Sequence, residues 1–293
     1  MLDADIRGFF DSIDHEWMLA FLRHRIGDER VLRLIQKWLG AGVMEHGKRT
    51  VSEKGTPQGA TISPLLANVY LHYALDQWAS QWRRKRADGD VIIVRYADDF
   101  VVGFQHVRDA RRFQAELAER LRKFSLELHP EKTRLIQFGR FAIQNRADQG
   151  LGKPETFTFL GLRHICARTR AGKFLIKRIS DRKRQRAKLG SLKAELRRRR
   201  HDSICQQGVW LRAVVAGYFN YHAVPTNIHA LDSFRTQVGR LWCRSLRRRS
   251  QRHRLPWERM NQIVTHWLPH PRILHPYPEQ RFGVNIRGRS PVR

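Results

Sequence analysis

The run VIIVRYADDFVVGF, residues 91–104, decides the fold class of this chain. Both halves are rich in β-branched and aromatic residues, which favour strands, and Ala97-Asp98-Asp99 stands between them where a tight turn is expected. The run therefore predicts an antiparallel hairpin with two adjacent carboxylates at its tip. Asp is also common in turns, because its side chain bonds to nearby backbone, so the pair taken alone has a structural interpretation as well.

A third carboxylate lies in a short strand at the start of the chain. Residues 2–6, LDADI, alternate apolar and polar side chains, which predicts a strand with Asp5 near its end. Carboxylates gathered on neighbouring strands require a cation between them. Paired Mg²⁺ ions held by such carboxylates catalyse phosphoryl transfer to a hydroxyl group. We therefore expect Asp5, Asp98 and Asp99 to form a site for two Mg²⁺ ions.

Helical patterns surround these strands. Amphipathic helices are predicted at residues 15–25 and 28–39, with Asp28 as N-cap and Gly40 just past the end of the second. After a loop rich in Gly and Pro, Ser63-Pro64 predicts the start of another helix. Beyond the hairpin, the patterns predict helices at 110–124, 209–222, 228–246 and 256–267, and strands at 135–138 and 157–165.

Six segments of the sequence resemble motifs of bacterial group II intron reverse transcriptases and occur in the same order as in that family. They are the first catalytic motif, the nucleotide-binding loop and helix, the second catalytic motif, two motifs that close the palm, and the maturase or thumb signature. The matching segments are, in the same order, residues 5–15, 55–68, 96–99, 130–133, 157–161 and 210–221. Together these motifs extend over nearly the whole chain, so chance similarity is not a serious alternative.

The resemblance implies an α+β fold: a reverse transcriptase palm, which is an antiparallel sheet with packed helices, followed by an α-helical basic thumb/maturase domain. We place the palm at residues 1–170, the thumb/maturase domain at 171–268, and an irregular tail rich in Pro and Arg at 269–293. Family members carry a fingers region before the first catalytic motif, whereas this sequence begins almost on that motif. A mis-called start, a truncated gene copy and half of a split polymerase each fit that beginning.

The resemblance also implies a role for each carboxylate. Asp5 and Asp98 match the principal Mg²⁺ ligands, and Asp99 matches a third carboxylate of the same site. Phe10 matches the aromatic ring that excludes a ribose 2′-hydroxyl and so selects deoxynucleotides. A bulky ring against the sugar is physically sufficient for that selection.

Three further residues match contacts with the incoming nucleotide. Gln58 and Gly59 match residues that lie against it, where glycine allows close approach of the backbone. Lys132 matches a lysine near the triphosphate, where its charge neutralises phosphate. The partners implied are dNTPs, a DNA primer or target, and an RNA template that would be the intron RNA itself.

Positive charge is concentrated in the second part of the chain. The formal net charge is +29, and residues 161–293 carry 31 Lys and Arg against 6 Asp and Glu, whereas residues 1–160 are nearly balanced. This excess predicts a polyanionic partner, and nucleic acid fits better than a membrane surface because no lipidation signal accompanies the charge. The candidate RNA-binding residues are Arg182, Lys183, Arg184, Arg197, Arg198, Arg199 and Arg200.

Aromatic residues are interleaved with these cations. Rings of this kind stack on unpaired bases in some RNA-binding proteins, but their helical spacing here favours packing inside a helical core. The rings in question are Trp210, Tyr218, Phe219, Tyr221 and Trp242.

Several other classes of protein are disfavoured. The three Cys residues are widely separated, which argues against a zinc module with paired cysteines. The sequence shows no secretory signal and no apolar run long enough to span a membrane, so we expect a cytoplasmic protein.

We therefore expect an RNA-directed DNA polymerase of the group II intron type, encoded by a mobile genetic element, that also assists intron splicing. One alternative is a non-catalytic RNA-binding maturase or truncated remnant, which would bind RNA tightly without using its carboxylates. Another is a reverse transcriptase associated with host defence. Substitution of Asp98 distinguishes the polymerase from the non-catalytic maturase, because the polymerase would lose nucleotide incorporation whereas the maturase would still bind RNA.

Overall fold

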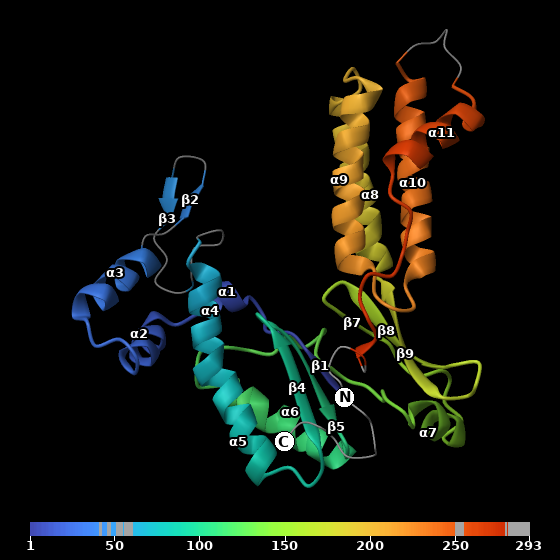
Figure 1. Cartoon of the computed structure of the whole chain (residues 1–293). Helices are drawn as coiled ribbons and strands as arrows, with labels where there is room; N and C mark the ends of the chain where they lie inside the picture. Colours follow the sequence, from blue (N-terminus) through green and yellow to red (C-terminus); the bar gives the residue numbers. More distant parts are fainter. Residues whose placement is uncertain are drawn as a thin grey trace. The chain divides into compact units, whose positions relative to one another are not determined.

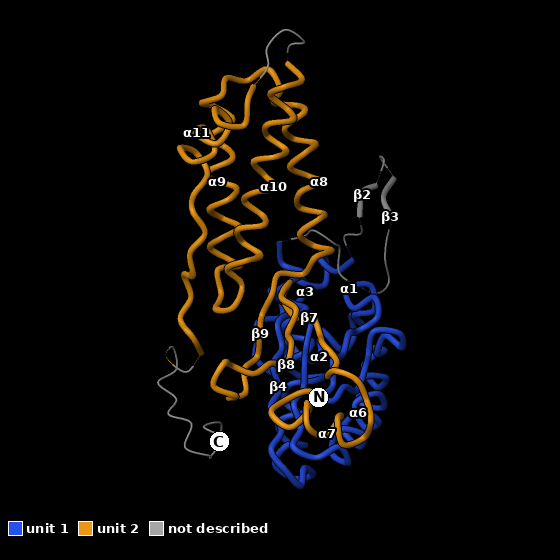
Figure 2. The backbone as a smooth tube through the Cα atoms, turned by 90° about the vertical axis from the view of Figure 1, so that its right-hand side faces the viewer, with its two compact units in different colours: residues 1–137, 292 blue, residues 138–291, 293 orange. Residues whose placement is uncertain are grey.

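A computed structural model of the chain describes residues 1–40, 43–45, 48–50, 55, 61–249, 255–278 and 280. Contacts divide the chain into two compact units, residues 1–137 (unit 1) and residues 138–291 (unit 2), shown in Figure 2. This division falls earlier than the boundary predicted near residue 170. The assignment of palm, thumb/maturase domain and tail to residue ranges stays a prediction.

Unit 1 mixes strands and helices, as the sequence predicts (Figure 1). Its elements are β1 (Leu2–Ala4), α1 (Phe9–Ser12), α2 (His15–Arg23), α3 (Glu29–Leu39), β2 (Val43–Glu45), β3 (Lys48–Thr50), α4 (Ser63–Leu71), the π-helical turn η1 (His72–Asp76), α5 (Gln77–Lys85), β4 (Val91–Tyr96), β5 (Asp99–Phe104), α6 (Val107–Arg122) and β6 (Arg134–Leu135).

A four-stranded antiparallel sheet with the order β4-β5-β1-β6 is the centre of unit 1. Leu2 lies opposite Val102 and Ala4 opposite Phe100, and all four side chains are buried. Because side chains alternate along a strand, Asp3 and Asp5 project from the other face of the sheet. The predicted hairpin and the predicted N-terminal strand are therefore confirmed as neighbours in one sheet.

Helices cover the apolar face of this sheet. In α6, Phe113, Leu117 and Leu121 are fully buried at helical spacing, and the helix packs against β5 and η1. The helix caps predicted at Asp28 and Gly40 are confirmed, since the Asp28 carboxylate accepts from the N–H of Arg30. The helix predicted at Ser63-Pro64 begins one residue earlier than expected, with Ile62 as its N-cap.

Unit 2 combines a small antiparallel sheet with long helices (Figure 1). Its elements are α7 (Ala142–Asp148), β7 (Phe157–Phe159), β8 (Leu162–Arg168), β9 (Phe174–Ser180), α8 (Arg182–Arg198), α9 (Ile204–His222), α10 (Ile228–Arg247) and α11 (Trp257–Trp267). β8 pairs with both β7 and β9. None of the described helices is both long enough and apolar enough to cross a membrane.

Three of these helices stand side by side, with α10 in contact with both α8 and α9 (Figure 1). Short connections at 199–203 and 223–227 join them, so α9 runs antiparallel to α8 and α10, and those two run in the same direction. Their shared core contains Leu211, Phe234 and Trp242, which are fully buried.

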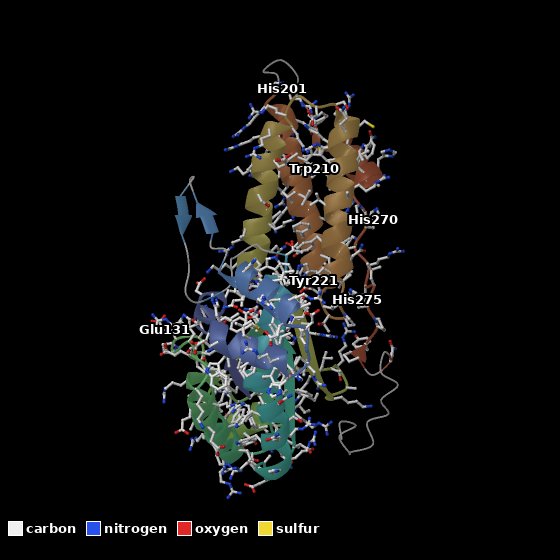
Figure 3. The ribbon with its side chains drawn as sticks, turned by 90° about the vertical axis from the view of Figure 1, so that its left-hand side faces the viewer. Glu131, His201, Trp210, Tyr221, His270 and His275 are labelled. Atoms are coloured by element: carbon white, nitrogen blue, oxygen red, sulfur yellow. The ribbon has the colours of Figure 1, made fainter. Side chains whose placement is uncertain are left out.

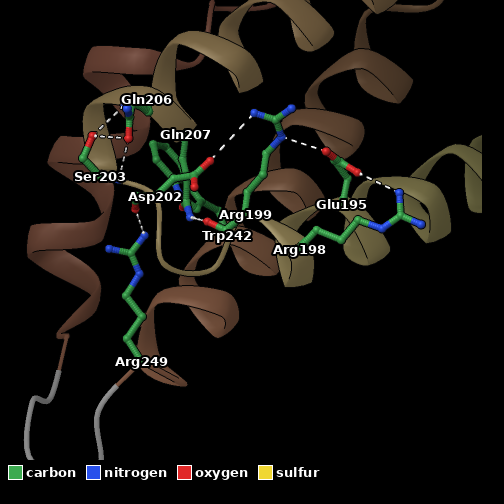
Figure 4. A network of polar contacts seen from close by, with 9 residues as sticks. All are labelled: Glu195, Arg198, Arg199, Asp202, Ser203, Gln206, Gln207, Trp242 and Arg249. Carbon is green, nitrogen blue, oxygen red and sulfur yellow. Dashed lines mark hydrogen bonds and ion pairs between the residues drawn. The ribbon is translucent and has the colours of Figure 1, made fainter.

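A buried polar network ties the helix ends of unit 2 together (Figure 4). The side chain of Gln207 is fully buried, and its Oε1 accepts from Trp242 Nε1 at 2.7 Å, while its Nε2 donates to the carbonyl of Arg199. Ser203 and Gln206 form a capping box at the start of α9. Each buried polar group of Gln207 therefore has a partner, as a stable helical core requires.

Candidate active site

The end of β1 and the tip of the β4–β5 hairpin meet at one edge of the sheet. Ala4 pairs with Phe100, so Asp5 and Asp99 are the next residues outward on neighbouring strands. Tyr96 pairs with Asp99, which leaves Ala97 and Asp98 as a two-residue turn. The register therefore gathers Asp5, Asp98 and Asp99 at this edge, and all three are half-buried.

The turn that carries Asp98 has an unusual backbone. Ala97 has a φ of +54°, in the left-handed region that glycine adopts freely. For a residue with a Cβ atom this conformation is unfavourable by about 1 kcal/mol. Such strain concentrates at functional sites, where surrounding contacts hold the backbone in place.

Arg95 supplies the holding contacts for this turn. Its guanidinium donates to both carboxylate oxygens of Asp76, at 2.8 and 2.6 Å, and to the Asn68 side chain at 2.9 Å. The same group donates to the carbonyl of Ala97 at 2.8 Å. Asn68 belongs to α4 and Asp76 to η1, so Arg95 fastens the hairpin tip to that helix. Sequence reasoning missed this clamp, although an Arg in an otherwise apolar strand was its signal.

Lys132 lies against the same carboxylates. Its Nζ is 2.6 Å from Asp5 Oδ2, and this hydrogen bond, with the nearby charges of Asp5, Asp99 and Asp98, raises the pKa of the lysine. The backbone brings it there, because the N–H of His129 donates to the carbonyl of Asp5 at 2.8 Å. The three carboxylates therefore act together on one cation.

A second ion pair lies beside the first on this face of the sheet. Asp3 is opposite Arg134 in the β1–β6 register, and their side chains are 3.2 Å apart. Burial raises the pKa of Asp3 in spite of Arg134, and the charge of Asp5 adds to the effect. Asp3 is thus engaged by Arg134.

Phe10 lies on α1, packed beside the unit 1 core and 5.4 Å from the ring of Phe9. Gly55, the first residue of the predicted nucleotide-binding loop, is held against α1: a Cβ atom there would lie 2.8 Å from the carbonyl oxygen of Phe10. Its φ of +87° also requires glycine. The structure therefore brings the start of this loop to the backbone of Phe10, the residue that carries the predicted sugar-selecting ring.

Two hydrogen bonds fasten Gly55 in this place. Its N–H donates to the carbonyl of Ile13 at 2.7 Å, and its carbonyl accepts from His15 Nε2 at 2.6 Å. Gln58 and Gly59, the residues of this loop predicted to touch the nucleotide, lie outside the described residues.

The carboxylate site fits a metal ion in donor type and charge. Carboxylate oxygens are the ligands that Mg²⁺ prefers, and their combined field already attracts the ammonium group of Lys132. Among the residues that the structure describes, however, no three His, Cys, Asp or Glu side chains are grouped closely enough to hold a metal.

The predicted RNA-binding cations of unit 2 fall into different environments. Arg199 donates to Glu195 at 2.8 Å, and Arg198 is 3.6 Å from Glu195 (Figure 4). Arg199 also lies 5.1 Å from the ring centre of Trp210. Both side chains thus have an acidic partner within unit 2, and 82% of the Arg198 side chain is exposed.

The other predicted cations have no ion pair with a described acidic residue. Arg197 and Arg200 line a hollow between α8 and α10. Arg182, Lys183 and Arg184 are exposed in the first turn of α8. Contact of these side chains with RNA stays a prediction.

The aromatic residues that are interleaved with the cations of unit 2 are mostly packing residues. Three of them are buried: Tyr218, Phe219 and Trp242. Tyr221 is 55% exposed, and its hydroxyl donates to the carbonyl of Leu160 at 2.9 Å. His275, beyond α11, returns to this end of α9, where its Nε2 donates to the carbonyl of Asn220 (Figure 3).

Comparison with protein families agrees with this geometry. Residues 1–164 match a family model described as reverse transcriptase (RNA-dependent DNA polymerase). That segment contains the four-stranded sheet and the carboxylates Asp5, Asp98 and Asp99.

Individual proteins are similar over shorter stretches. The chain is 42% identical to group II intron-encoded protein LtrA of Lactococcus lactis subsp. cremoris over 84 residues, which are 29% of this chain and 14% of that protein. It is 31% identical to an uncharacterized 91 kDa protein in cob intron of Schizosaccharomyces pombe, over 50% of this chain and 18% of that protein. The matched regions thus span less than a fifth of either relative.

Among solved structures, telomerase from Candida albicans in complex with a TWJ fragment of telomeric RNA superposes with a TM-score of 0.43. The sequences are 12% identical, and the superposition covers 90% of this chain and 47% of that one.

Proposed function

The chain belongs to the reverse transcriptase (RNA-dependent DNA polymerase) family, its matches fit a group II intron reverse transcriptase/maturase, and from this premise we propose that it copies RNA into DNA. The observation that carries the proposal is the strand register, which sets Asp5 beside Asp99 at the tip that also carries Asp98. A site with this charge suits transfer of a nucleotide to a primer 3′-hydroxyl.

Each named side chain has a place in that reaction. Asp5, Asp98 and Asp99 would hold two Mg²⁺ ions, which when bound activate the attacking hydroxyl and neutralise the leaving phosphate. Lys132, already next to Asp5, would neutralise charge on the triphosphate of the incoming dNTP.

The nucleotide would be selected by residues at the α1 side of the sheet. Phe10 would exclude the 2′-hydroxyl of a ribonucleotide by contact with its sugar. Gln58 and Gly59 would lie against the nucleotide, and the fixed position of Gly55 beside Phe10 supports this arrangement.

Unit 2 would bind the RNA and assist splicing of the intron that encodes the chain. Its support is the positive charge of residues 161–293 and the exposed cations of α8. A second candidate function, RNA binding without catalysis, draws on the same cations. The carboxylates favour the polymerase, because a purely RNA-binding protein has no use for such a cluster of negative charge.

The first test replaces the turn carboxylate. Mg²⁺-dependent incorporation of dNTPs on a primed RNA template should fall at least about 100-fold in Asp98→Ala, because a metal ligand is lost. The control Asp90→Ala removes an exposed carboxylate of unit 1 outside the site and should retain activity. Equal activity of Asp98→Ala and the control would exclude the proposed site, and RNA binding in a chain with no activity would favour the second candidate.

The second test concerns selection of the sugar. Phe10→Ala should admit ribonucleotides, because the ring that would contact the 2′-hydroxyl is gone. Incorporation of rGTP and dGTP at one template position measures the ratio of the two kcat/KM values. This discrimination should fall about 10- to 200-fold, the range expected for removal of one packing contact. Unchanged discrimination would assign the selection to another residue.

A further inference from the structure

A groove lined with cations runs between α8 and α10. It consists of two adjoining hollows that share Lys193, Leu241 and Arg244 in their walls. The larger has a volume of about 300 Å³ and is also lined by Arg240. The smaller reaches toward the ends of both helices, and its further cations are Arg197, Arg200 and Arg248. None of the described residues in either wall is Asp or Glu.

The cations are spaced one per helical turn on two parallel helices. Four residues along a helix rise about 6 Å, so each helix offers a regular row of positive charge. The α8 row is Lys193 and Arg197, followed by Arg200 two residues past the end of the helix, and the α10 row is Arg240 and Arg244, followed by Arg248 at the C-cap. Such rows can follow a chain of phosphates.

Packing inside unit 2 does not account for these side chains. Neighbouring cations are used internally: Arg247 donates to the carbonyl of Leu255 and Arg249 to that of Asp202. The six groove cations have no ion pair with a described residue, and five of them are exposed. Helix dipoles favour cations in the last turn of a helix, but Lys193 and Arg240 lie before that turn in α8 and α10.

A glycine in the groove wall supplies an independent observation. Gly190 lies inside α8, where glycine weakens a helix, and a Cβ atom added there would meet nothing within 4 Å. Gly208 in α9 differs, because a Cβ atom there would collide with the ring of Trp267. Close packing within the protein thus explains Gly208 but not Gly190, and a glycine in a binding groove lets a ligand approach the backbone.

We propose that this groove binds the phosphate backbone of an RNA strand. The choice of RNA as the polyanion rests on the proposed function. Contacts of this kind hold a strand by charge and carry no sequence information. The groove adds Lys193, Arg240, Arg244 and Arg248 to the cations that the sequence predicts to contact RNA, and it leaves out the engaged Arg198.

The test compares two triple variants of the full chain. The groove variant, Arg197→Gln with Arg240→Gln and Arg244→Gln, removes three exposed groove cations. The matched control, Arg111→Gln with Arg122→Gln and Lys123→Gln, removes two exposed cations of α6 and the exposed lysine at its C-cap, none of which has a side-chain partner among the described residues. Fluorescence anisotropy with a labelled single-stranded RNA gives the affinity at several salt concentrations, and thermal unfolding checks that both variants fold.

The groove variant should lose at least tenfold more affinity than the control. Its slope of log affinity against log salt should become shallower by about 2, because each phosphate contact on a single strand contributes about 0.7. Equal losses in the two variants would reduce the effect to overall charge and overturn the proposal. Displacement of the RNA by polyglutamate at equal charge concentration would mark a site for an acidic protein and would overturn it too.

Gly190→Ala separates binding from stability. The added methyl group should raise the melting temperature by favouring the helix, and it should weaken RNA binding by crowding the groove. Binding equal to that of the unsubstituted chain would overturn the close approach proposed at Gly190. These assays need no nucleotide incorporation, so groove-specific binding by a catalytically inactive chain would contradict the polymerase proposal and leave the groove assignment in place.

Discussion

Asp109, at the start of α6, is the only fully buried charged side chain among the described residues. Its Oδ2 accepts from the N–H groups of Asp88 and Gly89, at 3.0 and 3.1 Å, and its Oδ1 is 3.4 Å from Arg112. Burial by itself would raise the pKa of this carboxyl, but those two N–H groups and Arg112 outweigh it, so the pKa is lowered. The ionised form is therefore the one that unit 1 stabilises.

Asp109→Ala should lower the free energy of unfolding by about 3 kcal/mol, because two N–H groups lose their acceptor and Arg112 loses its nearest carboxylate. Urea denaturation measures the change. The control Asp90→Ala, at an exposed carboxylate, should stay within about 0.5 kcal/mol of the unsubstituted chain. A similarly small change in Asp109→Ala would show that this network contributes little to stability.

Predictions for single residues succeed where the determining contact is local in sequence. The caps at Asp28 and Gly40 follow from neighbours within one helical turn, and the structure has both. The contact between Lys132 and Asp5 joins residues 127 positions apart, and no local pattern encodes it. The motif resemblance singled out both residues, but only the folded sheet shows that they touch.

Arg95 connects the β4–β5 hairpin to the interrupted helix α4–η1–α5 by hydrogen bonds. Its bidentate pair with Asp76 is largely shielded from water, with Arg95 15% exposed and Asp76 32% exposed. One of the acceptors is the carbonyl of the strained residue Ala97. Arg95 is therefore a positioning residue for Asp98, and π-helical turns such as η1 are frequent at functional sites.

Arg95→Gln should lower kcat for dNTP incorporation about 100-fold and leave KM for dNTP nearly unchanged, because the turn loses its orientation while the nucleotide contacts remain. Steady-state kinetics on a primed RNA template measure both constants. Asp76→Asn should have a similar effect, and the double variant should be no worse than either single one, since the two side chains act as a unit.

The control for this clamp is Arg108→Gln. Arg108 forms an equally short ion pair with Asp88, at 2.7 Å, but 76% of its side chain is exposed, so its loss should change neither constant. Additive effects of Arg95→Gln and Asp76→Asn would contradict the clamp.

Predictions for elements were most successful where the apolar pattern is regular. β4, β5 and α6 lie where the alternation and the helical stripe place them. β9 and α7 were not predicted, because neither has a clean period in its sequence. Their boundaries depend on pairing and packing with distant segments, which override weak local preferences.

The fold class of the whole molecule follows from the order of elements, and the structure confirms the α+β class with antiparallel sheets and many helices. The boundary between the two compact units, after Gln137, could not be predicted in the same way, because the rise in positive charge comes later in the chain. The sheet β7–β9 consists of antiparallel strands, as the sheet of unit 1 does. It is nevertheless attached to the helices of unit 2, because Ser180 at the end of β9 forms hydrogen bonds with Asn227, the N-cap of α10.

The two units should respond to acid at different pH values. In unit 2, burial lowers the pKa of His164 and of His222, with nearby Arg178 and Arg184 acting in the same direction, so both rings are neutral in the folded state. Their contribution to stability is complete above the ordinary histidine pKa of about 6.5 and is lost as the pH falls through the lowered values.

Unit 1 should not lose stability in this way as the pH falls from 7 to about 4. The lowered pKa of Asp109 means that its contribution is lost only below the ordinary value of about 3.9. The raised pKa of Asp3 means that its burial penalty is relieved as the pH falls toward that range. Acidification from pH 7 to pH 5 should therefore weaken unit 2 and spare unit 1.

Amide hydrogen exchange of the full chain, corrected for the intrinsic effect of pH on exchange, resolves the two units in one experiment. Between pH 7 and pH 5, protection should fall in α8, α9 and α10 while β1, β5 and α6 keep theirs, because folded unit 2 keeps two buried imidazoles neutral that would bind protons on unfolding. Replacing His164 and His222 with Gln removes both titrating groups and should flatten the response of unit 2. Earlier loss in unit 1, or an unchanged slope in the double variant, would show that other groups control the acid response.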